Sequence, residues 1–256
     1  MPNPTRQHLA EKFSDLSWFQ NTKPDLQKEL LSLPEDFDAF LEDLAGRPVE
    51  INELDVLSLQ KIGFGHFLIF LVFEVRSTLT NQVFTYEYTS WKTGSRPGAK
   101  GIIFLEKEGK VTHFLVSRSH SFSTATENYE AIGGLYLHPF ENRLENLPKK
   151  LEQEICFHLG VDTLKFTKII NLGLSHPDLG MSNNTSLLFA AFVDISEAPI
   201  GIKKDFRATH KPVGFELEIL PIAQFKPFLQ KTNDNYFLSA AARIMTSQEI
   251  DFESHL

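Results

Sequence analysis

The chain has 256 residues, enough to bury one large core, or a large domain and a smaller one. Its 33 acidic and 25 basic residues give a formal net charge of −8, which argues against a general nucleic-acid or anionic-membrane surface. The single cysteine, Cys156, excludes an internal disulfide, and no apolar run approaches the ~20 residues that a membrane helix needs. The first residues lack the apolar segment of a secretory signal, so we expect a cytoplasmic protein with no nucleic-acid or membrane partner.

Short helices are expected in the first 50 residues. Leu9, Phe13 and Leu16 have the spacing of one helix face. A second helix is marked by a proline at its start, Pro34, and a glycine behind its end, Gly46, with apolar residues at helical spacing between them. The N-terminal region is therefore predicted to begin as a helical layer.

Two strands follow in the sequence. Residues 67–76 and 82–89 are rich in β-branched and aromatic side chains and flank a polar turn at 78–81. The segment 91–100, rich in Gly, Pro and Lys, is the expected domain boundary. We therefore predict a helical and strand-rich N-terminal region at residues 1–97 and a second domain at residues 98–256.

The second domain alternates strands and helices. A hairpin is predicted around Glu108-Gly109-Lys110, and the final helix is predicted to be capped by Asp234. The core-facing residues of that helix are predicted to be Leu238, Ala241, Ala242 and Met245. The other predicted elements are strands at 101–106, 111–117, 166–174, 187–195 and 215–220 and a short helix at 224–229. Mixed strands with segregated helices predict an α+β fold, an α/β/α sandwich with a mixed sheet.

The stretch from Glu130 to Val161 combines a glycine pair, an acidic loop and a helix that we predict at 148–159. Its core-facing stripe is Leu151, Ile155 and Leu159, and Gly160 follows its end. Glu154 and His158 are also four residues apart, so both project from a neighbouring face. Cys156, beside the stripe, is interpreted as a small apolar core residue rather than a nucleophile.

This stretch resembles the Nudix box, G-x5-E-x7-R-E-U-x-E-E-x-G-U, in which U is apolar. Gly134 matches the first glycine, Gly160 the last, and Glu154 the glutamate of the R-E pair. The match is degenerate, because Gln153 stands at the arginine and Phe157 and His158 stand at the next two glutamates. The loop is five residues longer than in the family, so its glutamate corresponds to Glu141 or Glu145.

The order of elements over residues 98–246 resembles the ADP-ribose and nucleotide-sugar pyrophosphatase branch of that family. The run 130–134, Glu-Ala-Ile-Gly-Gly, stands where the branch has an E-L-P-A-G-like run. A later loop glutamate of the branch corresponds to Asn184, whose neutral amide cannot accept a proton at working pH. In that branch the N-terminal strands serve dimerisation, which implies a homodimer with residues 51–97 in the interface. A fainter resemblance is to NDP-hexose 2,3-dehydratases, whose subunits have a Nudix-like core.

The resemblance implies a set of site residues. The implied catalytic positions are Glu154, His158 and Asn184. The implied ligands of a weakly held Mg²⁺ or Mn²⁺ are Glu154, His158, Glu141 and Glu145, and an imidazole among them favours later metals over Mg²⁺. The implied ligand-binding residues are Gly133, Gly134, Arg118 and Arg143. Each implied role has a structural alternative. Glu154 and His158 could lie on a solvated helix face, and the glycine pair could form an ordinary turn. The loop glutamates and the arginines could be surface charges.

Two classes of function follow. The first is a Nudix-fold protein that binds a small nucleotide-linked ligand with weak or no hydrolysis, and the second is an active metal-dependent pyrophosphatase of such compounds. We expect the first, because metal catalysis on a diphosphate needs several negative ligands and the box has lost two of them.

Overall fold

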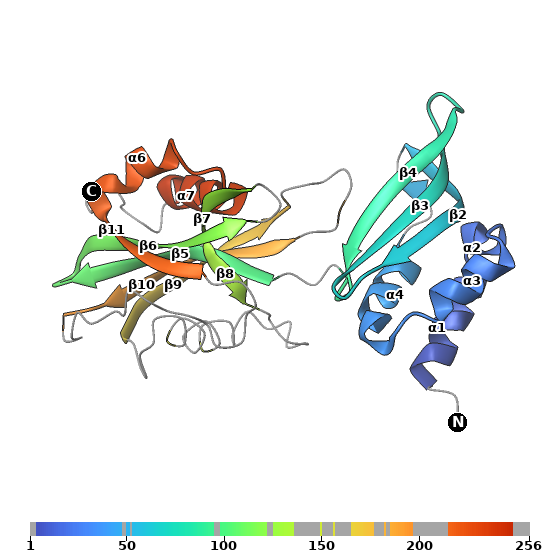
Figure 1. The fold of residues 1–256 in the computed structure, drawn as a ribbon, viewed down its shortest axis with the longest axis horizontal. Helices are drawn as coiled ribbons and strands as arrows, with labels where there is room; N and C mark the ends of the chain where they lie inside the picture. Colours follow the sequence, from blue (N-terminus) through green and yellow to red (C-terminus); the bar gives the residue numbers. More distant parts are fainter. Residues whose placement is uncertain are drawn as a thin grey trace. The chain divides into compact units, whose positions relative to one another are not determined.

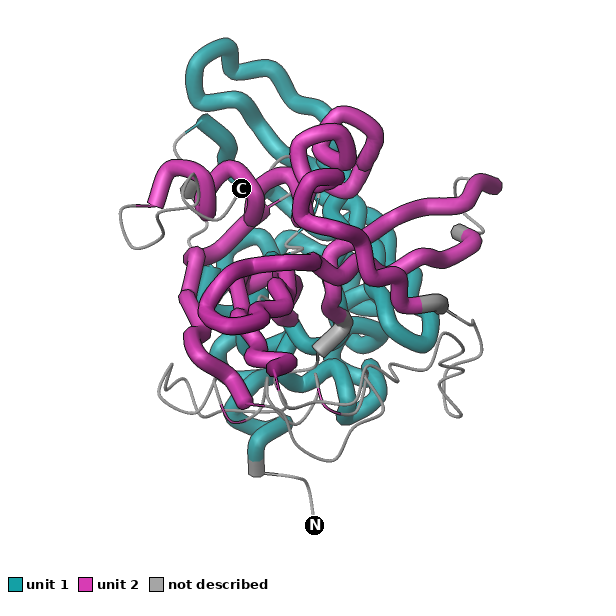
Figure 2. Tube along the Cα trace, turned by 90° about the vertical axis from the view of Figure 1, so that its left-hand side faces the viewer, with its two compact units in different colours: residues 1–96, 178–185 teal, residues 97–177, 186–256 magenta. Residues whose placement is uncertain are grey.

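The computed structural model describes residues 4–47, 50–51, 53–94, 98–121, 125–135, 149, 156, 165–176, 182, 185–196 and 215–247. The chain forms two compact units (Figure 2). Unit 1 comprises Met1–Arg96 with Asp178–Thr185, and unit 2 comprises Pro97–Pro177 with Ser186–Leu256. Ser182 bridges to Thr89, which ties the short second segment of unit 1 to the first. That residues 1–97 and 98–256 are separate folding domains stays a prediction.

Unit 1 begins with the predicted short helices (Figure 1). These are α1 (Pro4–Ser14), α2 (Ser17–Gln20), α3 (Pro24–Leu31), the 3-10 helix η1 (Glu35–Phe37) and α4 (Asp38–Ala45). Their apolar side chains pack on one face of a sheet, and Trp18 meets Phe73 of that sheet edge to face, with ring centroids 5.4 Å apart. The helical layer expected from the sequence is confirmed.

The unit 1 sheet is antiparallel, in the order β1-β2-β3-β4. Its strands are β1 (Glu50–Ile51), β2 (Leu54–Phe64), β3 (Leu68–Ser77) and β4 (Val83–Trp91). The two predicted strands correspond to β3 and β4. Strand β2 was not predicted, because two register shifts interrupt its pairing with β3 and break the two-residue alternation that marks a strand.

Unit 2 is built on a mixed sheet in the order β11-β6-β5-β10-β9 (Figure 1). The strands on this path are β5 (Gly98–Lys107), β6 (Lys110–Ser121), β9 (Lys165–Ser175), β10 (Ser186–Asp194) and β11 (Phe215–Pro221). Only the β5–β10 pair on this path is parallel. Every predicted strand of this region is present, although β5 begins at Gly98, inside the segment predicted as a loop.

The β5–β6 hairpin forms where the sequence placed it. Lys107 pairs with Lys110, which leaves Glu108 and Gly109 as a two-residue turn. Both turn residues have positive φ, 54° and 75°, as a type I′ turn requires.

Two short strands fill the gap where β5 and β6 diverge. They are β7 (Thr126–Glu130), which pairs with β6, and β8 (Ile132–Leu135), which pairs with β5. The segment therefore changes partner between residues 130 and 132. We call β7 and β8 together the wedge. Its second strand, β8, carries the glycine pair that the sequence singled out.

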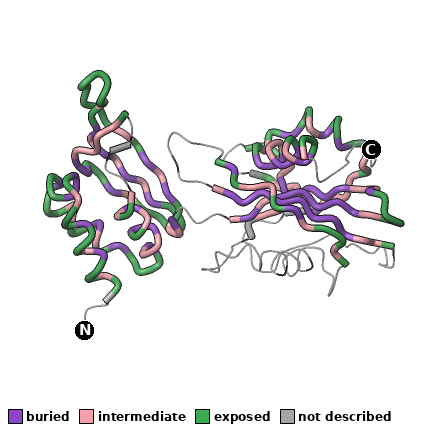
Figure 3. Tube along the Cα trace, turned by 180° about the vertical axis from the view of Figure 1, so that it is seen from behind, coloured by how far each residue is buried: buried purple, intermediate pink, exposed green. Residues whose placement is uncertain are grey.

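Both faces of the unit 2 sheet are apolar. One face packs against α6 (Phe225–Leu229) and α7 (Asn235–Thr246), which follow the 3-10 helix η3 (Ile222–Gln224). The other face presents a second buried cluster that includes Ile103, Leu115 and Phe189. Strand β10 is buried along nearly its whole length, as Figure 3 shows for the centre of this sheet. Lys149 and Cys156 of the predicted 148–159 helix are in helical conformation, and Cys156 is buried; the rest of that helix lies outside the described residues.

The final helix is present, but of its four predicted core-facing residues only Ala241 is buried. Ala242 and Met245 are exposed, and Leu238 is only partly buried. The buried residues are Tyr236, Phe237, Ala240, Ala241 and Ile244. Phe237 and Ile244 lie one position before Leu238 and Met245, so the apolar stripe that we chose was rotated by one residue.

Candidate functional site

The centre of the candidate site is the point where the wedge changes partner. Glu130 pairs with Ser117 of β6, whereas Ile132 pairs with Gly101 of β5. The backbone N–H of Ala131, between them, donates to the carboxylate Oδ2 of Asp234 at 2.6 Å. A buried amide needs a hydrogen-bond acceptor. Asp234 provides it for Ala131, at the residue between the segment paired with β6 and the segment paired with β5.

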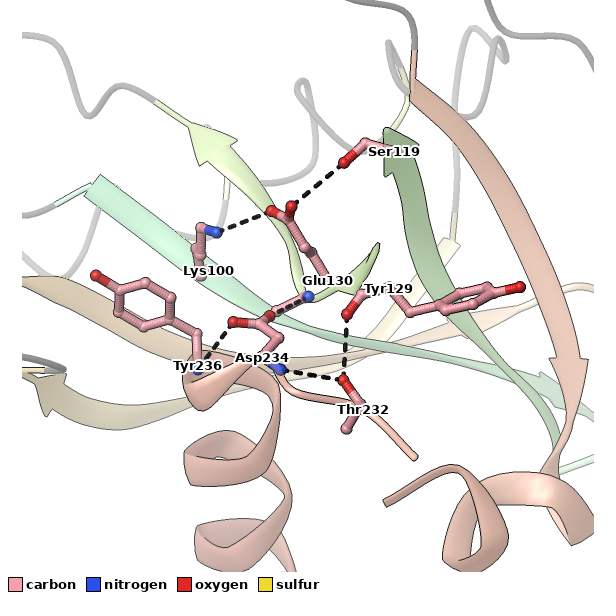
Figure 4. Close-up of polar contacts among 8 residues, drawn as sticks. Lys100, Ser119, Tyr129, Glu130, Thr232, Asp234 and Tyr236 are labelled. Carbon is pink, nitrogen blue, oxygen red and sulfur yellow. Dashed lines mark hydrogen bonds and ion pairs between the residues drawn. The ribbon is translucent and has the colours of Figure 1, made fainter. Parts of the chain in front are cut away.

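Asp234 also starts helix α7. Its Oδ1 accepts from the backbone N–H of Tyr236 at 3.1 Å, which confirms the predicted N-cap. Thr232 reinforces the arrangement, because its hydroxyl donates to the carbonyl of Tyr129 at 3.1 Å and accepts from the Asp234 N–H at 3.3 Å. The β7–β8 junction is thus fixed on both sides of Glu130 by residues that precede α7 (Figure 4).

Gly133 lies directly opposite Lys100 in the β5–β8 ladder. A Cβ at position 133 would lie 2.4 Å from Cγ of Lys100 and 2.8 Å from the carbonyl oxygen of Ala99. The aliphatic stem of Lys100 therefore occupies the space that a side chain at 133 would need. Glycine is required here by packing, independently of any ligand.

The ammonium group of Lys100 lies among polar and aromatic groups. Its Nζ is 3.4 Å from Oε2 of Glu130 and 4.9 Å from the ring centroid of Tyr236. The other oxygen of Glu130 accepts from the hydroxyl of Ser119 at 3.3 Å. Figure 4 shows these side chains converging from β5, β6, the end of β7 and the start of α7. We call Lys100, Ser119, Glu130 and Tyr236 the Lys100 cluster.

Arg118, a predicted ligand-binding residue, is engaged elsewhere. Its guanidinium contacts Glu127 at 2.5 Å and Glu218 at 3.0 Å, and these hydrogen bonds raise its pKa above the usual value. Arg118 and Ser119 are adjacent on β6, so their side chains point to opposite faces of the sheet. An anion at Arg118 would have to compete with two carboxylates.

Most predicted site residues lie outside the described part of the chain. These are Glu141, Arg143, Glu145, Glu154, His158 and Asn184. Gly134 belongs to β8, next to Gly133. Among the described residues, no group of three or more His, Cys, Asp or Glu side chains is close enough to hold a metal ion.

The sequence did not single out Lys100, Ser119 or Tyr236. Lys100 reads as one charge in a Lys-containing loop, and Tyr236 as a core residue of a helix. Their association depends on the wedge and on the N-terminus of α7 meeting at one place, which no local pattern encodes. The Asp234 cap and the run 130–134, with its glycine pair, were the local signals that pointed there.

The described residues contain no helix that is long and apolar enough to span a membrane.

Comparisons with known proteins support the fold. No protein-family model matches the sequence, and a search of curated proteins finds no significant match. The structure is similar to a solved structure described as an ADP compounds hydrolase, with a TM-score of 0.54 at 12% sequence identity. The match covers 81% of this chain and 99% of the other. Unit 2 makes up well under 81% of the chain, so the similarity extends into unit 1. The predicted Nudix-like α+β fold is confirmed.

Proposed function

We propose that the protein binds a small nucleotide-linked ligand through its Nudix-like domain and hydrolyses it weakly or not at all. The observation that carries the proposal is the fold shared with an ADP compounds hydrolase along most of both chains. The glycine pair of β8 lies in that fold beside a cluster that holds a cation, a carboxylate and an aromatic ring. These groups have the chemistry to bind phosphate, ribose hydroxyls and a planar base.

Weak hydrolysis follows from the residues of the degenerate box. Phe157 cannot coordinate a metal, and Asn184 cannot act as a base. Hydrolysis of a diphosphate relies on cations that neutralise developing charge, and these cations need several carboxylate ligands. Loss of one positioned electrostatic group typically lowers the rate by about 10²–10³.

The metal is the second part of the proposal. Glu154 and His158, with Glu141 or Glu145, would form a site with mixed oxygen and nitrogen ligands. Such a site prefers Mn²⁺ to Mg²⁺, because imidazole suits the later metal better. It should weaken below about pH 6.5, where an unperturbed histidine is protonated.

An active pyrophosphatase is the competing candidate. It is favoured by Glu154, which matches a box glutamate, and by the acidic residues of the long loop, which offer replacement ligands. The two candidates differ in turnover rather than in binding, so one set of measurements separates them.

The test combines binding and turnover with ADP-ribose as the probe. We expect ADP-ribose to raise the melting temperature of the protein, and its turnover with Mg²⁺ or Mn²⁺ to stay below about 1 s⁻¹, the low end of typical enzymes. Mn²⁺ titrations by calorimetry should show binding that EDTA abolishes and that Glu154→Gln and His158→Ala weaken. Glu152→Gln, a neighbouring charge, is the matched control and should bind Mn²⁺ as the wild type does.

Faster turnover would establish the hydrolase and reject weak hydrolysis. If ADP-ribose and related sugar nucleotides leave the melting temperature unchanged at millimolar concentration, the binding proposal is wrong. Equal Mn²⁺ binding by all variants would mean that Glu154 and His158 are not metal ligands and that they belong to a solvated helix face.

A further inference from the structure

The hydroxyl of Tyr236 is buried and has no hydrogen-bond partner among the described residues. The residue as a whole is 9% exposed. A buried hydroxyl without a partner costs about 1–3 kcal/mol, and buried polar groups in native proteins nearly always have one. In Figure 4 the ring extends from the start of α7 and its hydroxyl points away from the carboxylate of Asp234. The group is therefore placed to donate to something other than its own helix.

Lys100 brings a positive charge to the same ring. Its Nζ lies 4.9 Å from the ring centroid, within the range of a cation–π contact. Its contact with Glu130, at 3.4 Å, is long for a charge-assisted hydrogen bond. An ammonium group has three N–H donors, and Glu130 is its one acceptor among the described residues, so donors remain for an anion.

The stem of Lys100 fixes where that charge lies. It passes over Gly133, in the space that any other residue at this position would fill. The lysine is therefore anchored beside the glycine pair, with its ammonium between the wedge and α7. Glu130 keeps a second hydrogen bond, from Ser119, when Lys100 turns away from it.

We propose that Lys100 and Tyr236 form an anion-binding pair that takes a phosphate oxygen of a diphosphate group. Lys100 exchanges its long contact with Glu130 for the phosphate, and the Tyr236 hydroxyl donates to the same group. A lysine ammonium is a compact point charge suited to phosphate oxygens. This inference rests on the proposed function and assigns the part of the ligand that this cluster recognises.

The test measures binding to the full-length protein by calorimetry, with ADP, inorganic pyrophosphate and adenosine as probes. Lys100→Met retains a stem over Gly133 without the charge, and we expect it to weaken ADP and pyrophosphate binding about 10- to 100-fold, as loss of a charge-assisted hydrogen bond does. Tyr236→Phe removes only the hydroxyl and should weaken both about 2- to 10-fold. Lys100→Arg should restore most of the affinity. Lys110→Met, which replaces an exposed lysine at the start of β6 beside the hairpin turn, is the matched control and should bind as the wild type does.

A stability measurement separates a binding role from a structural one. Because the Tyr236 hydroxyl has no described partner, Tyr236→Phe should leave the melting temperature of the ligand-free protein equal to or above that of the wild type. A lower melting temperature would mean that the hydroxyl stabilises the fold, and it would count against the proposal.

The outcomes distinguish this inference from the proposed function. If the wild type binds ADP and both variants bind it equally well, the anion-binding pair is wrong and the proposed function stands. If the wild type binds no nucleotide, the proposed function fails. The pyrophosphate titration then tests whether Lys100 and Tyr236 form an anion-binding pair. Pyrophosphate binding that Lys100→Met abolishes supports the pair, whereas no pyrophosphate binding by the wild type overturns it.

Discussion

At the scale of single residues, Asp234 joins two parts of unit 2 with one carboxylate. One oxygen caps α7, and the other accepts the N–H of Ala131, where the wedge changes partner. The cap was predictable because an aspartate before an apolar helix is a local signal. The bond to Ala131 was not predictable, because it joins residues 103 positions apart in the chain.

Replacing Asp234 with alanine should destabilise the protein by about 1.5–5 kcal/mol. The lost cap accounts for about 0.5–2 kcal/mol, and the buried amide of Ala131, left without a partner, adds about 1–3 kcal/mol. Urea denaturation followed by far-UV circular dichroism measures the change. Asn235→Ala, an exposed neighbour on the same helix, is the control and should stay within about 0.5 kcal/mol of the wild type. Equal stability of the two variants would mean that the Asp234 contacts contribute nothing to folding.

Gly133 illustrates a second limit at this scale. The sequence marked it as part of a glycine pair, and the resemblance implied an approach to a ligand. The structure adds a packing reason, because Lys100 of the neighbouring strand fills the space beside it. The contact between Gly133 and Lys100 depends on the register of β8 against β5. The sequence could therefore mark the glycine as a candidate residue but could not mark the lysine.

At the scale of elements, strands with strong apolar runs were predictable and irregular ones were not. Strand β10 contains an uninterrupted apolar run, residues 187–193, that is buried in the sheet, and its predicted bounds were close. Strand β2 escaped prediction because its pairing shifts twice within its length. Helix α7 was predicted with the wrong face, because apolar residues occur on both sides of its buried stripe and spacing alone did not decide between them.

The corrected face of α7 leads to a matched pair of substitutions. Ile244 is fully buried, so Ile244→Ala should cost about 2–5 kcal/mol through lost burial and the cavity that remains. Met245 is 48% exposed, so Met245→Ala should change stability by about 0.5 kcal/mol or less. Urea denaturation by circular dichroism measures both, and a larger loss for Met245→Ala would restore the face predicted from the sequence.

The Ile244→Ala variant also tests whether the chain is divided into two independently folding domains. Both tryptophans, Trp18 and Trp91, belong to unit 1, so their fluorescence reports on that unit alone. If residues 1–97 and 98–256 fold independently, Ile244→Ala should shift the transition seen by circular dichroism and leave the fluorescence transition in place. Coincident shifts by both probes would mean that the chain unfolds as one cooperative unit.

At the scale of the whole molecule, the order of elements identified the architecture better than any single motif did. Mixed strands with helices segregated after them predicted an α+β sandwich, and the shared fold confirms it. The wedge of β7 and β8 was not foreseen, because two short strands that exchange partners have no periodicity of their own. The candidate site depends on that wedge, which explains why its residues were harder to predict than the fold around them.

Unit 1 exposes a group of large apolar side chains at one end of its sheet, which we call the apolar end. Its members are Phe64, Phe67, Leu68 and Trp91, with exposed fractions of 51%, 50%, 41% and 37%. Leu68 and Trp91 are directly opposed in the β3–β4 ladder, so the group is contiguous there. Clustered exposed apolar side chains commonly mark an interaction surface, and a homodimer uses one such surface twice.

The homodimer predicted from residues 51–97 should therefore associate through the apolar end. We expect light scattering at high micromolar concentration to give twice the chain mass of 29.1 kDa. Replacing Phe67 and Leu68 together with serine removes apolar area that drives association, so this variant should give the single-chain mass. Leu79→Ser, at the opposite end of the same sheet and 74% exposed in the wild type, is the matched control and should remain dimeric. If the wild type has the mass of a single chain, the dimer prediction is wrong. If the double variant remains dimeric, the interface lies on a surface other than the apolar end.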